Sequence, residues 1–227
     1  MVRTYLVTGS NSEVGALVCA KLKCTENRVV RVDAHGGDIN ADLSTAPGRL
    51  ELAERAIELT GGQVDAIITT SNTNVNKPVA ISNNFYGITQ LIEALNDELR
   101  KSSTPRVAIL NFYDETKSIS TELLESILHA TEKKALKIAQ QILETTPDLA
   151  QQNYVTSQKA LQSWVYETGQ KKFLRKRKIF VNSVTANKTA SASEIAELLI
   201  WLASPANQTH NGEVFNANAL IELSPAL

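Results

Sequence analysis

Short apolar stretches of strand length alternate along the chain with longer stretches in which apolar residues recur at helical spacing. Strands are predicted at residues 4–8, 28–33, 64–70, 106–111, 178–184 and 213–216. Helices are predicted at residues 13–23, 82–100, 121–143, 149–169 and 193–203, and one more follows Ser44, which can cap it with Pro47 in its first turn. The last of the numbered helices is expected to be capped by about Ser193.

Regular alternation of strands and helices predicts an α/β fold, a doubly wound parallel sheet with helices on both faces. The 227 residues suit one large domain of this kind. No Pro/Gly/Ser-rich linker divides the chain and no internal repeat is visible, so residues 1–227 are interpreted as a single domain.

The bulk composition narrows the possible partners. A hydrophobic content of 43% is normal for a globular protein, and a net charge of −1 does not indicate nucleic acid or an anionic membrane as a partner. No apolar run approaches a membrane span, and a strand begins almost at once where a signal peptide would stand. Cys19 and Cys24 are expected to be free thiols in a reducing cytoplasm.

Two further groups of residues are candidates for a metal site and for a phosphate-binding site. The histidines His35, His129 and His210 share no metal-ligand spacing, so no metal site is expected. The basic run at residues 171–178 could bind phosphate-rich partners, but a solvated helix end is the favoured interpretation.

The stretch "VTGSNSEVGALVCAKL" lies at the first strand–helix junction, where helix N–H groups can meet a pyrophosphate. Gly9 permits the tight turn and Gly15 the close packing of helix on strand. Ser12 or Glu13, depending on register, replaces the middle glycine of the dinucleotide fingerprint, and Val14 follows. A carboxylate beside a pyrophosphate would repel it, so the motif alone leaves a working nucleotide site and a plain turn equally open.

Asp33 favours the nucleotide interpretation. It ends the second predicted strand about 20 residues after the glycine turn, where an acidic residue accepts hydrogen bonds from the adenosine ribose. A carboxylate there disfavours a 2′-phosphate, so NAD is preferred over NADP. Asp42 and Leu43 could hold the adenine edge. The alternative is that Asp33 merely begins a loop.

The chain resembles the short-chain dehydrogenase/reductase family, and within it the bacterial hydroxysteroid dehydrogenase/carbonyl reductase branch. The likeness rests on "VTGSNSEVGA", "VDAHGGDINADLSTAPGR", "SNNFYGITQLIEAL", "YVTSQKAL" and "WLASPANQTHNGEVFN", in the expected order over nearly the whole length. The resemblance implies a Rossmann-type sheet of about seven strands and a nicotinamide cofactor.

In that family a Tyr exchanges the proton, a Lys lowers the pKa of the Tyr and binds the nicotinamide ribose, a Ser positions the substrate oxygen and an Asn supports a proton relay. The resemblance places the Tyr on Tyr154 and the Asn on Asn84. The Ser position falls on Asn111 and the Lys position on Gln158.

These two replacements predict weakened chemistry. A free tyrosine has a pKa of about 10, and a neighbouring cation lowers it. Gln158 can donate a hydrogen bond but brings no charge. Lys159 cannot take over, since on a helix it turns about 100° away from the face that Tyr154 and Gln158 share. Asn111 could still hold an oxygen through its amide.

Two more positions depart from the family pattern. Ala186 and Asn187 stand where the family commonly has Pro-Gly, and the mobile loop expected to follow is nearly gone. Residues 69–72, "TTSN", replace the usual Asn-Ala-Gly after the fourth strand of the family's sheet, which puts Ser71 and Asn72 beside the expected cofactor.

Three functions remain open from the sequence. The first is an atypical NAD-linked oxidoreductase with weak or altered catalysis on an unknown small molecule. The second is a pseudoenzyme that acts as a binding or scaffold protein, with NAD bound weakly or not at all. The third is a non-redox enzyme using Tyr154 and Asn111. The helical insertion at residues 121–144 resembles one used for subunit association, which implies a homo-oligomer; a simple lid over the cleft edge is the other interpretation.

Overall fold

The computed structural model describes residues 2–170, 179–186 and 190–217. At its centre is a parallel sheet of seven strands in the order β3-β2-β1-β4-β5-β6-β7. The strands are β1 (Thr4–Thr8), β2 (Arg28–Asp33), β3 (Ile39–Asn40), β4 (Ala66–Thr69), β5 (Arg106–Asn111), β6 (Phe180–Thr185) and β7 (Val214–Asn216). The Rossmann-type doubly wound fold expected from the sequence is confirmed.

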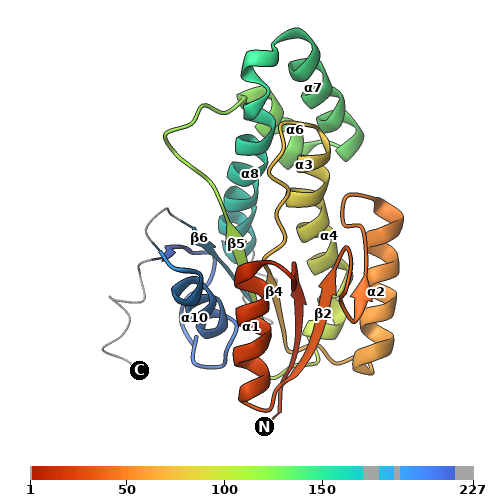
Figure 1. Ribbon diagram of the computed structural model, residues 1–227, viewed down its shortest axis with the longest axis vertical. Helices are drawn as coiled ribbons and strands as arrows, with labels where there is room; N and C mark the ends of the chain where they lie inside the picture. The colour runs from red at the N-terminus through yellow and green to blue at the C-terminus, as the bar shows by residue number, and fades with distance from the viewer. Residues whose placement is uncertain (1, 171–178, 187–189, 218–227) are drawn as a thin grey trace.

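Helices cover both faces of this sheet (Figure 1). One face carries α1 (Glu13–Cys24) and α10 (Ala192–Leu202), and the other α2 (Ala46–Thr60), α4 (Gly87–Ala94) and α8 (Gln151–Gln170). Successive residues of a strand pack on opposite faces of the sheet. Leu6 and Ile67 belong to the apolar cluster on one face, and Val7 and Ile68 to the cluster on the other. This is the pattern of strands buried on both faces of a parallel sheet.

The helix predicted at residues 82–100 begins earlier, at Val79, and is divided into four pieces. These are α3 (Val79–Ile81), the π-helix η1 (Ser82–Tyr86), α4 and α5 (Asn96–Leu99). A π-turn holds one residue more than an α-turn and often occurs at functional sites. The segment therefore has the apolar spacing of a helix while its hydrogen bonding changes along its length.

Helix starts also differ from prediction in three places. The cap of α2 is Thr45, whose hydroxyl accepts a hydrogen bond from the Gly48 N–H, not Ser44. The cap of α10 is Ser191 rather than Ser193, in a capping box with Glu194. The helix predicted at 121–143 is broken, because Thr131 caps a new helix.

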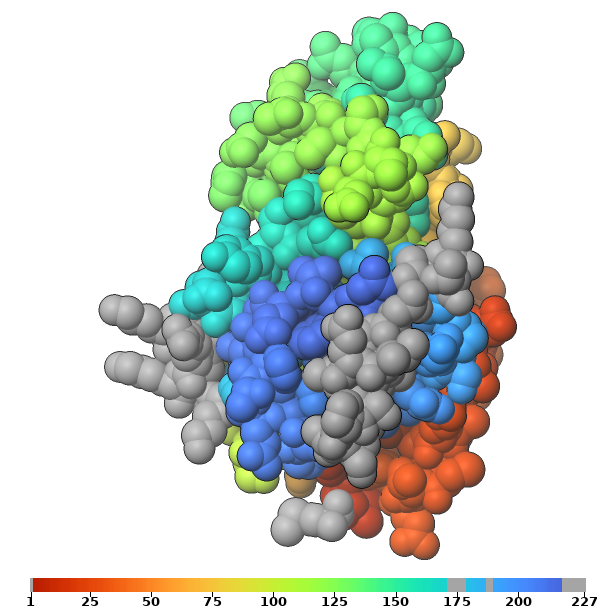
Figure 2. Space-filling model, turned by 90° about the vertical axis from the view of Figure 1, so that its left-hand side faces the viewer, coloured from red at the N-terminus to blue at the C-terminus, as the bar shows by residue number. Residues whose placement is uncertain are grey.

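The broken helix consists of α6 (Thr121–His129) and α7 (Glu132–Thr145), followed by the short η2 (Pro147–Leu149). Figures 1 and 2 show α6 and α7 at one end of the molecule, beyond the sheet and its covering helices. The insertion is tied to the body by an ion pair between Arg49 and Glu132 at 2.6 Å, with the Arg49 side chain only 4% exposed. The Tyr86 hydroxyl adds a hydrogen bond to the Ile127 carbonyl at 3.4 Å.

Several sequence features can be placed, and others cannot. Cys19 and Cys24 are both free, Cys19 buried and Cys24 exposed. None of the helices in the described parts of the chain has the length and hydropathy needed to cross a membrane. The basic run at 171–178 and residue 187 of the shortened loop lie outside the described residues.

Candidate functional site

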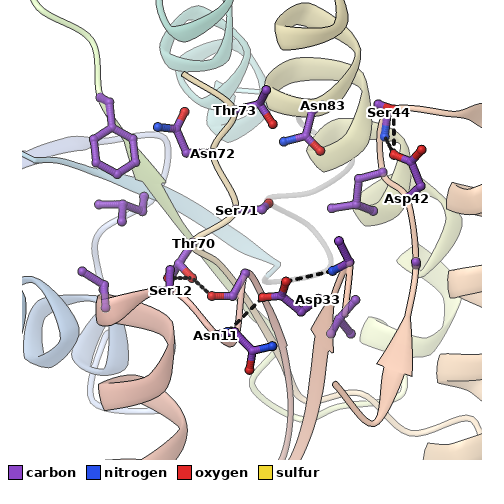
Figure 3. Close-up of a pocket in the computed structure, with 18 of the residues that line it drawn as sticks. Asn11, Ser12, Asp33, Asp42, Ser44, Thr70, Ser71, Asn72, Thr73 and Asn83 are labelled. Atoms are coloured by element: carbon purple, nitrogen blue, oxygen red, sulfur yellow. Dashed lines mark hydrogen bonds between the residues drawn. The ribbon is translucent and has the colours of Figure 1, made fainter. Parts of the chain in front are cut away.

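A cleft of about 780 Å³ opens at the carboxyl edge of the sheet, where the ends of β1 and β2 face those of β4 and β5 (Figure 3). Dinucleotides bind at this place in open α/β sheets, because the chain order reverses here and the crevice widens. The predicted residues Gly9, Ser12, Glu13, Val14, Asp33, Asp42, Leu43, Ser71 and Asn72 line it. It is also lined by Asn11, Val32, Ala34, Ala41, Ser44, Thr70, Thr73, Val79, Asn83, Leu110 and Phe112.

The glycine turn after β1 requires its two glycines. Gly9 has φ +69°, and a Cβ built there would lie 2.4 Å from the Ser71 backbone nitrogen. A Cβ on Gly15 would lie 2.1 Å from the Gly9 carbonyl oxygen, so Gly15, although not lining the cleft, lets α1 approach the turn. Ser12 caps α1 by accepting from the Gly15 N–H at 3.0 Å. The turn thus presents the N-terminus of a helix to the cleft, as a phosphate site requires.

Glu13 decides the ambiguity that the sequence leaves. Since Ser12 is the cap, Glu13 is the first residue of α1, and it is exposed and lines the cleft. A carboxylate in the first turn interacts favourably with the positive end of the helix dipole and stabilises the helix. The same charge opposes a pyrophosphate. Together with Asp33 and Asp42 it makes the cleft acidic, and among the described residues no lysine or arginine lines it.

Asp33 stands at the end of β2 with its carboxylate over the glycine turn. One oxygen accepts from the Asn11 N–H at 2.9 Å and the other from the Ala34 N–H at 2.8 Å. Because each carboxylate oxygen accepts one hydrogen bond, each keeps a lone pair that can accept from a ligand hydroxyl. This geometry fits the expected contact with an adenosine ribose.

Asp42 and Leu43 form the rim beyond β3. One Asp42 carboxylate oxygen accepts from both the N–H and the hydroxyl of Ser44, at 2.9 and 2.6 Å. Leu43 packs against Gly87, where an added Cβ would lie 2.9 Å from that of Leu43. The Leu43 carbonyl accepts from buried Arg49 at 2.9 Å. The rim is therefore fixed in place by α2 and α4.

At the other end of the cleft, Tyr154 on α8 is bonded to a neutral amide. Its hydroxyl accepts from the Asn72 side chain at 3.2 Å. The Gln158 amide nitrogen donates to the Asn72 oxygen at 3.1 Å, and the Gln158 oxygen accepts from the Phe112 N–H at 3.0 Å. Burial raises the pKa of Tyr154 above its ordinary value, and the Asn72 hydrogen bond lowers it by less. Tyr154 therefore holds its proton at neutral pH.

Asn111 is differently placed from the role that the resemblance implies. It is fully buried, its amide nitrogen donates to the Gln158 carbonyl at 2.9 Å, and its oxygen accepts from the Tyr113 N–H at 2.8 Å. The next residue, Phe112, lines the cleft instead. An apolar ring therefore stands where the end of β5 meets the site.

Asn84 lies inside the π-helix and holds the loop after β4. Its oxygen accepts from the Thr73 N–H at 2.8 Å, and its nitrogen donates to the Thr73 carbonyl at 3.1 Å. The same nitrogen reaches the Ser157 hydroxyl at 3.4 Å. Ser157 in turn donates to the Tyr154 backbone carbonyl at 2.7 Å, so the Asn84 amide is engaged by the loop after β4 and by α8.

Lys159 follows Gln158 on α8. Its amine lies 5.1 Å from the centre of the Tyr113 ring, a cation–π distance. Sequence reasoning missed Phe112 as a cleft residue. The alternation of side chains along β5 could have indicated it, since adjacent strand residues face opposite ways.

Comparison with known proteins supports the fold. No family model matches the chain. A 3-alpha-hydroxysteroid dehydrogenase/carbonyl reductase from Comamonas testosteroni is 23% identical over 109 residues, 47% of this chain and 42% of that protein, so the match spans less than half of either.

Two solved structures cover nearly the whole chain. The 3-alpha-hydroxysteroid dehydrogenase from Pseudomonas sp. B-0831, complexed with NADH, has a TM-score of 0.85 at 22% identity over 99% of this chain and 100% of its own. An oxidoreductase of the short-chain dehydrogenase/reductase family from Brucella ovis, complexed with a partially ordered NAD, has a TM-score of 0.68 at 16% identity over 96% and 100%. The chain has the fold of the short-chain dehydrogenases.

Proposed function

We propose that this chain is a short-chain dehydrogenase/reductase that binds NAD(H) in the cleft and has weak or altered oxidoreductase activity. The observation that carries the proposal is the hydrogen-bonded series of Tyr154, Asn72 and Gln158. The tyrosine is present, but its neighbours in the series are neutral amides rather than a cation that could lower its pKa. The substrate is a small molecule whose identity the cleft does not specify.

The cleft fits a dinucleotide at its outer end. Gly9 and Gly15 allow the tight turn and the close approach of α1, where a Cβ would collide with backbone atoms, and the N-terminus of α1 lies at the cleft. Asp33 has lone pairs free for ribose hydroxyls. The similar structures from Pseudomonas and Brucella were obtained with NADH and NAD. Glu13 is the feature that fits least, and it is the reason to expect weak binding.

The inner end supports limited chemistry. A bound nicotinamide would supply a hydride in carbonyl reduction or take one up in alcohol oxidation, and this chain would correspondingly have to donate or accept a proton. Tyr154 can donate its phenol proton to a carbonyl oxygen, but without a cation the resulting phenolate is not stabilised. Phe112 offers no hydrogen bond to the substrate oxygen. Proton transfer is therefore possible in principle and poorly assisted.

Two measurements on the purified protein test the proposal. Calorimetric titration with NADH, NAD⁺, NADPH and NADP⁺ measures cofactor binding, and loss of NADH absorbance with a panel of aldehydes, ketones and hydroxysteroid-type ketones measures turnover. We expect NADH to bind and turnover to be slow. Turnover as fast as that of an enzyme with an intact Tyr–Lys pair would contradict the altered chemistry. Absence of any dinucleotide binding would favour a scaffold protein or a non-redox enzyme.

We also propose that the chain forms a homo-oligomer through the insertion made by α6 and α7. The insertion projects from one end of the molecule, which makes it accessible to a second copy (Figure 2). Light scattering on the intact protein and on a variant with a charge placed at Leu136 or Ile138, both partly buried on α7, tests this. An unchanged mass in both proteins at the monomer value would contradict it.

The free thiols of Cys19 and Cys24 support the proposal that the protein is located in a reducing cytoplasm.

A further inference from the structure

Arg49 on α2 is a buried cation that contacts three other segments of the chain. The residue is 3% exposed. One terminal nitrogen of its guanidinium donates to the carbonyls of Leu43 at 2.9 Å and Ser82 at 3.4 Å. The other terminal nitrogen donates to the Glu132 carboxylate at 2.6 Å. These acceptors belong to the rim beyond β3, to the π-helix η1 and to α7. The guanidinium therefore joins the insertion to two segments of the body.

Both of those body segments border the cleft. Asp42 and Leu43 line it from the rim, and Asn83, which follows Ser82 in η1, lines it as well. The described residues of α7 do not line it. Because a single nitrogen of Arg49 donates to both Leu43 and Ser82, it fixes the rim relative to the π-helix at the end of the cleft where the adenine is expected.

The charge of Arg49 makes this arrangement depend on the insertion. A buried cation is costly unless a carboxylate pairs with it. Among the described residues, Glu132 is the carboxylate that pairs with Arg49, and the Arg49 Nε is buried there without a hydrogen-bond partner. If α7 moved away, the guanidinium would have to turn toward water to recover its solvation. The buried carbonyls of Leu43 and Ser82 would then lose this donor.

We propose that Arg49 is a positioning residue for ligand binding: paired with Glu132, it holds the rim and the π-helix in the positions that receive the adenosine. The affinity of the cleft for a dinucleotide then depends on the docking of α7, and a bound dinucleotide in turn favours the docked insertion. This inference rests on the proposed binding of NAD(H) in the cleft. It gives the insertion a role in the cleft that is separate from subunit association.

Calorimetric titration with NADH, at a temperature where circular dichroism shows each variant to be folded, tests the role of Arg49. Glu132→Gln removes the counter-charge and keeps the size of the side chain, and we expect it to bind NADH at least fivefold more weakly. Loss of a negative charge should by itself favour an anionic ligand, so weaker binding has the opposite sign to the long-range electrostatic effect. Glu132→Asp keeps the carboxylate and should bind NADH more tightly than Glu132→Gln.

Two control variants separate positioning from charge and from stability. Glu197→Gln makes the same change of charge in the surface pair with Lys21. Leu198→Ala removes a fully buried side chain from α10, on the other face of the sheet, and lowers the stability of the fold. Both controls should bind NADH within twofold of the intact protein.

The outcomes separate this inference from the proposed function. A loss of less than fivefold in Glu132→Gln, or an equal loss in Leu198→Ala, overturns the role of Arg49 and leaves the proposed cofactor binding standing. Failure of NADH to bind the intact protein overturns the proposed function and this inference with it. If Glu132→Gln does not fold, the double variant Arg49→Met/Glu132→Gln removes both charges together with the donor to Leu43. It should show the same loss, and an affinity equal to that of the intact protein overturns the inference.

Discussion

The Gln158 side chain accepts a hydrogen bond from the backbone N–H of Phe112 and donates one to Asn72, which in turn donates to the hydroxyl of Tyr154. Gln158, where the resemblance implies an activating lysine, is thus a structural bridge between α8, the end of β5 and the loop after β4. Its replacement should change the acidity of the tyrosine and the stability of the site at once.

Gln158→Lys should lower the pKa of Tyr154, because an ammonium group favours the phenolate. Burial raises that pKa in the intact protein. At a pH of about 10 an unfolded tyrosine begins to lose its proton, whereas Tyr154 in the folded protein still holds it. The free energy of unfolding should therefore fall as the pH rises from about 10 through the raised pKa of Tyr154. A pH titration of phenolate absorbance, corrected with Tyr154→Phe, measures the shift.

Gln158→Met is the matched control for charge. Both variants leave the Phe112 N–H without its acceptor, which should cost about 1–3 kcal/mol of unfolding free energy in each. The lowered pKa should occur in the lysine variant alone. An equal pKa in the two variants would show that a cation at this position does not act on Tyr154.

Asp33 should discriminate against a 2′-phosphate. Its carboxylate is held over the glycine turn by the Asn11 and Ala34 N–H groups, so a second negative charge nearby is opposed by about 1–2 kcal/mol, a change in affinity of roughly fivefold to thirtyfold. Titrations should give weaker binding of NADPH than of NADH. Asp33→Asn should bring the two affinities together, whereas Asp38→Asn, at a carboxylate paired with Arg31 and not lining the cleft, should not. Tighter binding of NADPH by the intact protein would refute the assignment.

Glu13 should weaken pyrophosphate binding. It is the first residue of α1 and lines the cleft, so its charge and its Cβ both oppose the approach of a phosphate. The cost should be about 1–3 kcal/mol, a loss of affinity of roughly fivefold to a hundredfold. We expect Glu13→Gly to bind NAD more tightly in calorimetry, and the intact protein to purify without dinucleotide. Glu13→Gln keeps the Cβ and removes the charge, so the difference between the variants divides the two effects. No gain in either would show that Glu13 is not the obstacle.

The ion pair between Arg49 and Glu132 should stabilise the insertion. Glu132→Gln leaves a nearly buried guanidinium without its carboxylate, and because the Glu132 side chain is 21% exposed the loss should be about 2 kcal/mol in chemical denaturation, below that of a fully buried pair. Glu197→Gln breaks the surface pair with Lys21, in which both side chains are more than a third exposed, and should cost less than about 0.5 kcal/mol. Equal losses would mean that the buried pair does not anchor α7.

The predictable parts of the fold are those that depend on the spacing of apolar residues within one short segment of the chain. The runs at 4–8, 28–33 and 106–111 are strands because apolar and β-branched residues follow one another without a helical period. The two residues of β3 are too few to leave such a pattern. The π-helix at Ser82–Tyr86 keeps the apolar spacing of an ordinary helix, so its changed hydrogen bonding is invisible in the sequence.

The site was predictable as a set of positions but not as a set of bonds. Asn72, Tyr154 and Gln158 were each singled out, yet their mutual hydrogen bonds join segments that are distant in the chain. Asn111 was singled out because its amide could hold a substrate oxygen. The sequence does not show that this amide is bonded to Gln158 and Tyr113 or that the adjacent Phe112 lines the cleft. Which of two adjacent residues faces a site depends on the register of the sheet.

Amides do not titrate, and this gives the inner end of the cleft a particular response to its surroundings. Between mild acid and the alkaline range in which Tyr154 ionises, nothing in the bridge of Asn72, Gln158 and the Phe112 backbone changes charge. Added salt likewise has no ionic contact there to screen. Among the described residues that line the cleft, the charged ones are Glu13, Asp33 and Asp42 at the opposite end. The dependence of ligand affinity on ionic strength should therefore report which half of the cleft a bound molecule occupies.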